Sequence, residues 1–181
     1  MKHLIVIICF FISISANAQT SVNYTEIVKV DSISAKVLFE RARAWFVASF
    51  HDSKNVLEIN DKESGELAGK GSIKATYSIM GASNWPYGYL YYHISISTKD
   101  GKYKVQISSY RHEYNTIKGG EQSYGDISDN HNPDRDYEML LCGDRCKKKL
   151  WNDLQKQCID NNKELIASLK KAMLSTAGSD W

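Results

Sequence analysis

Proline and cysteine are scarce in this sequence, and neither sign of charge dominates it. Among 181 residues there are two prolines and four cysteines, and the formal net charge is +2. These values exclude a collagen-like fibre, a disordered tail and a disulfide-dense miniature protein. The nearly balanced charge also argues against a nucleic-acid-binding protein, which usually has a marked basic excess. The length is that of one ordinary domain.

Long hydrophobic runs are also lacking, apart from one at the N-terminus. Residues 4–15 form an apolar run of about twelve residues, which is too short to span a bilayer as a helix. The small residues Ala16 and Ala18 follow it with the spacing of a signal-peptide cleavage site. We therefore expect residues 1–18 to be a cleavable secretory signal. The mature chain, 19–181, is then one domain in the periplasm or outside the cell, without a transmembrane segment.

Three cysteines remain after this cleavage, namely Cys142, Cys146 and Cys158. Along a helix Cys146 and Cys158 would be about 18 Å apart, too far for a disulfide. Cys142 and Cys146 are close enough to pair, and an exported compartment permits it, so we predict this disulfide. Two free thiols, or zinc ligation together with His131, are the alternatives. Cys158 shares an apolar helical stripe with Trp151 and should be a buried thiol.

Two segments have apolar residues at helical spacing. Ser34 is a suitable N-cap for the first, in which Leu38, Phe39 and Trp45 fall on one side. The second covers about residues 145–175, and Asn161 and Asn162 interrupt its stripe, which suggests a bend. Four lysines recur there every seven residues, close to aspartates, and predict a solvated charged face: Lys149, Lys156, Lys163 and Lys170.

Five segments have the composition of strands: residues 22–31, 56–60, 66–79, 87–98 and 102–114. Asp100-Gly101 is a strong signal for a two-residue hairpin loop. The order is therefore β-α-β-β-β-β-α, which predicts an α+β fold with a five-stranded antiparallel sheet. Only one face of the hairpin strands is consistently aliphatic, so we expect both helices on that face. Residues 80–86 are expected to be a loop, and residues 115–143 to be irregular.

Three stretches of the sequence have a recognisable pattern: residues 39–46 (FERARAWF), 61–71 (DKESGELAGKG) and 97–103 (STKDGKY). Together they resemble a family of exported bacterial domains of unknown function with a TATA-binding-protein-like fold. The resemblance is strongest over residues 24–114. It implies the fold and no activity. DNA binding does not carry over, because the mature chain is nearly neutral and exported.

The hairpin also predicts a candidate site. A two-residue loop places Lys99 opposite Lys102, and regular alternation from there gathers seven aromatic side chains on the outward face. Such a surface suits sugar rings, a peptide or an envelope protein. The alternative is a second small core, covered by residues 80–86 or 115–143. The seven candidate ligand-binding residues are Tyr87, Tyr89, Tyr91, His93, Tyr110, His112 and Tyr114.

Motifs of catalysis and metal binding are missing. There is no Gly-x-Ser-x-Gly or His-Glu-x-x-His pattern, and the acidic residues around Asp134 lack the spacing of a calcium loop. We expect no cofactor and no metal. The sequence favours a non-catalytic exported binding domain for an unidentified ligand or envelope protein. The alternative is a hydrolase that uses His93 or His112 as a base.

Overall fold

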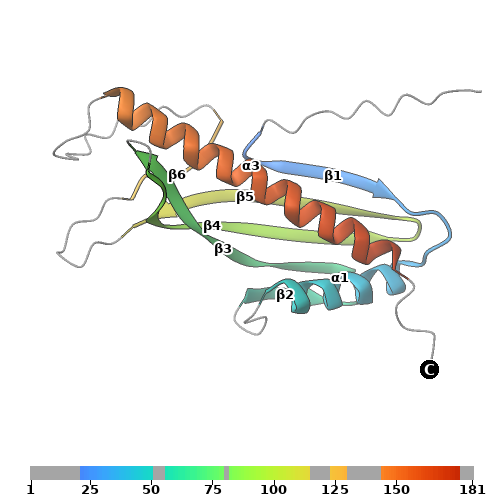
Figure 1. Ribbon diagram of the computed structural model, residues 1–181. Coiled ribbons are helices and arrows are strands. Elements are labelled where there is room, and N and C mark those ends of the chain that lie inside the picture. The colour runs from blue at the N-terminus through green and yellow to red at the C-terminus, as the bar shows by residue number, and fades with distance from the viewer. Residues whose placement is uncertain (1–20, 51–55, 80–81, 115–122, 130–143, 176–181) are drawn as a thin grey trace, which may run out of the picture.

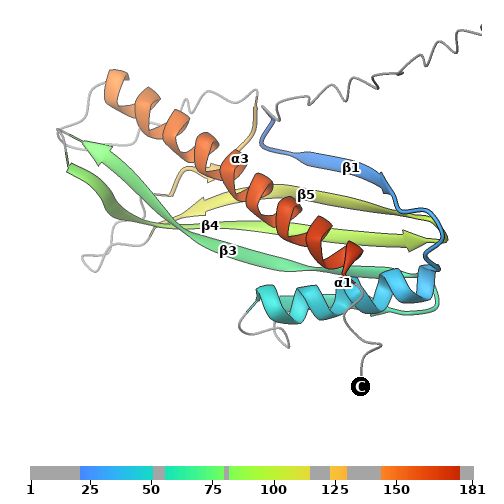
Figure 2. The same ribbon diagram turned by 45° about the vertical axis from the view of Figure 1, so that its right-hand side comes forward.

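The computed structural model describes residues 21–50, 56–79, 82–114, 123–129 and 144–175. One antiparallel sheet forms one layer, and two helices form the other. Figure 1 and Figure 2 both show the long helix α3 running diagonally across one face of the sheet, with α1 beside it. The α+β class, the antiparallel sheet and the placement of both helices are therefore confirmed.

In the part of the chain that the structure describes, the sheet has six strands, one more than the sequence predicts. Its order is β1-β5-β4-β3-β2. The short β6 also pairs with β5, at Arg111 and His112, further along β5 than the residues that pair with β1. β6 falls in the stretch that was expected to be irregular, and β4 begins within the expected loop. The strands are β1 (Tyr24–Lys29), β2 (Leu57–Asp61), β3 (Glu66–Ile79), β4 (Ala82–Lys99), β5 (Lys102–Glu113) and β6 (Gly125–Asp126).

The β4–β5 hairpin sets the register at one end of the sheet. Lys99 pairs with Lys102 across a two-residue loop, as predicted. Gly101 has a φ of +71°, a left-handed conformation that glycine adopts without steric cost. Asp100 accepts a hydrogen bond from the backbone N–H of Ala35 over 2.7 Å, so the hairpin also holds the first turn of α1.

Both helices bury the stripes that their spacing predicts. α1 (Ala35–Ser49) has Ser34 as its N-cap and buries Leu38, Phe39 and Phe46 against the sheet. α3 (Asp144–Leu174) is one continuous helix, so the bend predicted at the two asparagines is wrong. The helices meet where Trp45 Nε1 donates a hydrogen bond to Ser168 Oγ over 3.0 Å.

Candidate functional site

A β-bulge in β5 divides the predicted tyrosine surface between the two faces of the sheet. The register follows the prediction as far as His93 opposite Ser108, but Tyr91 then pairs with Arg111. Ser109 is the extra residue, and its φ of 58° lies in the left-handed region. From this point on, every side chain of β5 faces the side opposite to the one that regular alternation predicts.

A second irregularity, in β4, turns Tyr87 inward. Gly88 has a φ of +74°, and the pairing with β3 shifts between Lys74 and Thr76. A side chain at Gly88 would collide with the backbone carbonyl of Glu113, because its Cβ would lie 2.1 Å from that oxygen. Tyr87 is therefore buried on the face of the sheet that the helices cover. Tyr89, two residues later, is exposed on the opposite face, which is called the open face below.

The prediction of one outward face is thus wrong for four of its seven residues. Tyr87, Tyr110 and His112 are all buried on the side of the helices. Tyr114 is half-buried, and its ring packs against that of Tyr87 with centroids 5.0 Å apart. The physical reason lies in the two bulges, because each adds a residue and so inverts the alternation beyond it.

His112 is a structural histidine in this arrangement. Its side chain has no exposed surface, and its ring stacks on Tyr87 with centroids 4.8 Å apart. Nε2 lies 2.7 Å from the carbonyl oxygen of Tyr87, and Nδ1 accepts a hydrogen bond from the backbone N–H of Tyr124 over 3.0 Å. These partners define the neutral tautomer with the proton on Nε2. Burial lowers the pKa of His112, although the hydrogen bond to Tyr87 opposes this effect.

The inward aromatic residues form a second core under α3. Tyr87 contacts the rings of Tyr77, Tyr114 and Tyr124, and Tyr124 contacts that of Trp151 on α3. Residues 123–129 cover this group, with Tyr124 and Ile127 buried. The alternative of a second small core therefore accounts for this half of the predicted surface.

Tyr89, Tyr91 and His93 do lie together on the open face. The two tyrosine side chains are 44% and 41% exposed, and their ring centroids are 6.2 Å apart. Nδ1 of His93 is 3.6 Å from Oε2 of Glu58, whose other carboxylate oxygen is 2.5 Å from Lys70 Nζ. The hydrogen bond from the Lys70 ammonium holds the pKa of Glu58 below its usual range, although desolvation opposes this effect. This surface can offer aromatic contact flanked by charge.

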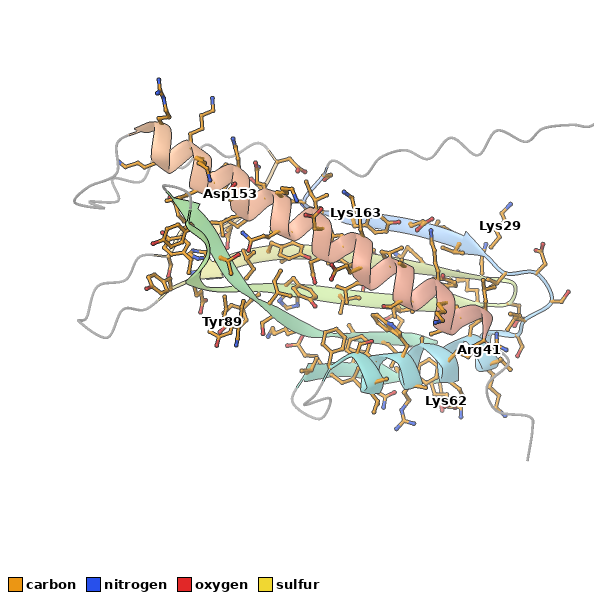
Figure 3. All side chains as sticks on the ribbon, viewed as in Figure 1. Lys29, Arg41, Lys62, Tyr89, Asp153 and Lys163 are labelled. Atoms are coloured by element: carbon orange, nitrogen blue, oxygen red, sulfur yellow. The ribbon has the colours of Figure 1, made fainter. Side chains whose placement is uncertain are left out.

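The opposite end of the open face is basic. Lys29 and Tyr89 lie near opposite ends of the sheet (Figure 3). Cross-strand pairing places Lys99, Lys102 and Lys29 in one row across β4, β5 and β1. The next row contains Ser97 and Lys104 between Glu66 and Ile27. A pocket of about 320 Å³ lies here, and Lys99, Lys102 and Lys104 are part of its lining.

The sequence contained a signal for this basic end. The predicted register already set Lys99 opposite Lys102, and like charges in directly opposite positions destabilise a sheet. The pairing of β1 with β5 was not predictable from local pattern, and it adds Lys29 to the row. Neither the pocket nor the cluster was predicted as a site.

The lysines of α3 behave as their spacing predicts. Lys149 lies 2.8 Å from Asp153, Lys156 contacts Asp160, and both pairs are exposed ion pairs four residues apart. Lys163 lies 3.5 Å from the same Asp160. Lys170 differs, because it contacts Glu26 on β1 over 2.7 Å and joins the helix to the sheet.

Among the described residues, no group of three or more His, Cys, Asp or Glu side chains is arranged to hold a metal ion. Cys158 is a free, buried cysteine, as predicted, and burial raises the pKa of its thiol. Cys142 and His131 lie outside the described residues, as does the side chain of Cys146, so the disulfide stays a prediction. No helix in the described part of the chain is long and apolar enough to cross a membrane.

Comparison with known proteins identifies the fold. A TBP-like protein from Parabacteroides distasonis superposes with a TM-score of 0.62 at 16% identity, covering 85% of this chain and 93% of that one. A DUF4468 family protein from Bacteroides ovatus gives 0.58 at 13% identity, covering 89% and 91%. No curated protein matches. The family model for a domain of unknown function (DUF4468) with TBP-like fold matches residues 24–113, and the chain belongs to this family.

Proposed function

We propose that this protein is an exported, non-catalytic binding domain and that the open face of its sheet is the binding surface. The observation that carries the proposal is the one-sided placement of the helices: α1 and α3 both cover the same face. On the other face, Tyr89 and Tyr91 of β4 are exposed. Exposed aromatic side chains on a rigid sheet supply contact area at a low cost in conformational entropy.

Further apolar side chains on the same face support this proposal. Ile27 on β1 is 63% exposed, and Ile59 on β2 is 44% exposed. Register places both on the open face, because Ile27 pairs with Lys104 and Ile59 pairs with Ala68. The surface therefore offers apolar contact on both outer strands and aromatic contact on the central strand β4, which suits a partner that spans several strands.

A hydrolase is the rival function, and only His93 remains as its candidate base. His112 is unsuitable, because backbone groups occupy both of its ring nitrogens. His93 is exposed, lies 3.6 Å from Glu58 and is paired with Ser108 across the strands, which is the one observation in favour of catalysis. Against it, Lys70 holds the Glu58 carboxylate more closely than His93 does. An enzyme should lose turnover and retain binding in the variant His93→Gln.

The binding surface can be tested with a ligand that the protein retains from its own cells. Native mass spectrometry of protein purified from the cell envelope should detect an added mass. The double variant Tyr89→Ala/Tyr91→Ala should lose that mass. Val47→Ala is the matched control, because Val47 is 54% exposed on α1, on the helix side of the molecule. A ligand retained by the double variant as well as by the unmodified protein would contradict the proposed surface.

Export is tested separately. The N-terminal sequence of the protein recovered from the periplasm or the medium should begin at Gln19, directly after the small residues that predict cleavage. Recovery of the protein with residues 1–18 still attached, in the cytoplasmic fraction, would contradict this part of the proposal.

A further inference from the structure

We propose that the pocket at the hairpin end of the open face binds a small organic anion with two or more negative charges. Di- and tricarboxylates and sugar bisphosphates have this chemistry. The inference deepens the proposed function, since it rests on the open face being the binding surface and states what kind of ligand one end of it takes. It concerns the basic end and not the tyrosines.

The size of the pocket sets the size of the ligand. Its volume is about 320 Å³, which is near the lower limit of the range typical of small-molecule sites. Four strands contribute to it, and its lining includes Ile27, Glu66, Ser97, Lys99, Lys102 and Lys104. The hollow is therefore built on the rigid part of the sheet and is large enough for a small metabolite, but not for a folded partner.

The charges of the lining select an anion. Three lysines against one glutamate leave an excess of two positive charges around the pocket. Lys29 adds a further charge at its border, because it pairs with Lys102 in the register of β1 and β5. Among the described residues, none of these lysines forms an ion pair with a carboxylate, although Lys70 on the same face does.

The lysine row is unfavourable unless an anion is present. Lys99, Lys102 and Lys29 occupy directly opposite positions on three strands that lie about 4.8 Å apart. Like charges in such positions repel and destabilise the sheet. A ligand with at least two negative charges would contact several ammonium groups at once and remove this repulsion. A monovalent anion would compensate only part of it.

The remaining lining favours an organic ligand. Ile27, with 63% of its surface exposed, supplies an apolar wall, and the hydroxyl group of Ser97 can donate a hydrogen bond. Asp100, the acidic residue of the hairpin loop, accepts the hydrogen bond from the Ala35 N–H at the start of α1. Glu66 is then the acidic group of the lining, and its removal should strengthen binding of an anion.

Isothermal titration of the full chain tests this assignment. Citrate and fructose 1,6-bisphosphate are the two probes, at constant ionic strength, with acetate as the monovalent control. Citrate binding alone would identify the ligand as a carboxylate, and bisphosphate binding alone would identify it as a phosphate ester. Either result supports the proposal, provided that acetate binds at least about tenfold more weakly, as its single charge predicts.

Four variants locate the binding. Lys102→Gln and Lys104→Gln should each weaken it by about five- to tenfold, because each removes a charge next to the anion. Glu66→Gln should tighten it, a result that a damaged fold cannot produce. Lys74→Gln is the matched control, because Lys74 is an exposed lysine of the same face in register with Tyr89, far from the pocket. It should change the affinity by less than about twofold.

The outcomes separate this inference from the proposed function. Absence of heat with both probes at millimolar concentration overturns the pocket, as does equal weakening by Lys74→Gln and Lys102→Gln. The tyrosine double variant addresses the other end of the face. If it loses the retained envelope ligand while neither anion binds, the inference fails and the proposed function stands. If the anions bind with the expected lysine dependence while the tyrosines prove irrelevant, the pocket stands and the aromatic surface fails.

Discussion

The hydroxyl group of Tyr110 on β5 donates a hydrogen bond to Oδ1 of Asn162 on α3 over 2.9 Å, at the centre of the layer between sheet and helix. Asn161 donates from Nδ2 to the same hydroxyl oxygen over 2.7 Å. Asn162 in turn donates to the carbonyl oxygen of Val22, next to β1. Burial raises the pKa of Tyr110, which stays protonated as a donor. Two neighbouring asparagines thus connect α3 to β5 and to the segment that leads into β1.

We expect Tyr110→Phe to lower the free energy of unfolding by about 1–3 kcal/mol. The ring still fills its space, but the buried amide of Asn161 and the Oδ1 of Asn162 lose a partner and stay away from water. Chemical denaturation monitored by tryptophan fluorescence measures the change. An unchanged midpoint would mean that water replaces the lost hydroxyl group.

Tyr103→Phe is the matched control for that prediction. Tyr103 is also buried in β5, but its hydroxyl group has no hydrogen-bond partner among the described residues. Its removal should leave stability unchanged or raise it, because no buried group loses a partner. The same denaturation experiment should therefore show a lower free energy of unfolding for Tyr110→Phe and an unchanged or higher one for Tyr103→Phe. A loss of stability for Tyr103→Phe as large as that for Tyr110→Phe would contradict this explanation.

The two bulges mark the limit of what the sequence could predict. Helix positions, the Asp100-Gly101 hairpin and the one-sided placement of the helices all follow from periodicity and turn chemistry. The bulge at Ser109 does not, because serine carries no local preference for a positive φ and the extra residue is stabilised by pairing with other strands. One such residue was enough to move Tyr110 and His112 from the predicted surface into the core.

The asparagines of α3 show a second limit of the same kind. Asn161 and Asn162 interrupt an apolar stripe, and from sequence they suggested a bend. They are instead buried, and their partners are a tyrosine hydroxyl and a backbone carbonyl from elements more than 50 residues away. Only the packing of the layers reveals that a polar residue at such a position has partners.

Tyr87 and Tyr89 should respond in opposite ways to truncation. Tyr89→Ala removes an exposed ring and should cost about 1 kcal/mol or less through lost cross-strand contact. Tyr87→Ala removes a buried ring that stacks on His112 and should cost about 3–5 kcal/mol. Denaturant unfolding of the two variants under identical conditions gives both values. Similar losses would show that the open face is covered in solution.

We expect stability to fall as the pH decreases from 7 to 5. Burial lowers the pKa of His112 below its ordinary value of 6.5, so the unfolded chain binds a proton there at a pH at which the folded protein does not. The contribution of His112 to the free energy of unfolding is therefore complete above the pKa that His112 has in the unfolded chain. It is lost as the pH falls from there towards the pKa in the folded protein, by up to about 1.4 kcal/mol per pH unit. Stability measured across this range should show the decline.

His112→Gln should flatten this pH dependence, because glutamine can donate and accept hydrogen bonds but does not titrate in this range. The carboxylates of Glu40, Glu58 and Asp160 do not interfere, since ion pairs hold their pKa values below ordinary values of 4.5 and 3.8. An equally steep decline in the variant would assign the effect to another group.

The cysteines should differ in reactivity. Cys158 is fully buried, and its raised pKa keeps it as the unreactive thiol, so iodoacetamide should modify it only after denaturation. Cys142 and Cys146 should resist modification until a reductant opens the predicted disulfide. Mass spectrometry of the native protein without reductant should therefore find no added label. Rapid labelling of all three residues would contradict both parts.

The extra residue at position 109 has a consequence for comparing this chain with its relatives. Ile107 and Tyr110 both point inward, so a chain that lacked Ser109 would keep every inward residue of β5 in place with a regular ladder. It would also avoid a left-handed serine, which costs about 1–2 kcal/mol. A relative shorter by one residue here therefore requires an alignment gap in the middle of a strand. If gaps were confined to loops, the residues from Tyr110 to Glu113 would be matched to partners on the opposite face.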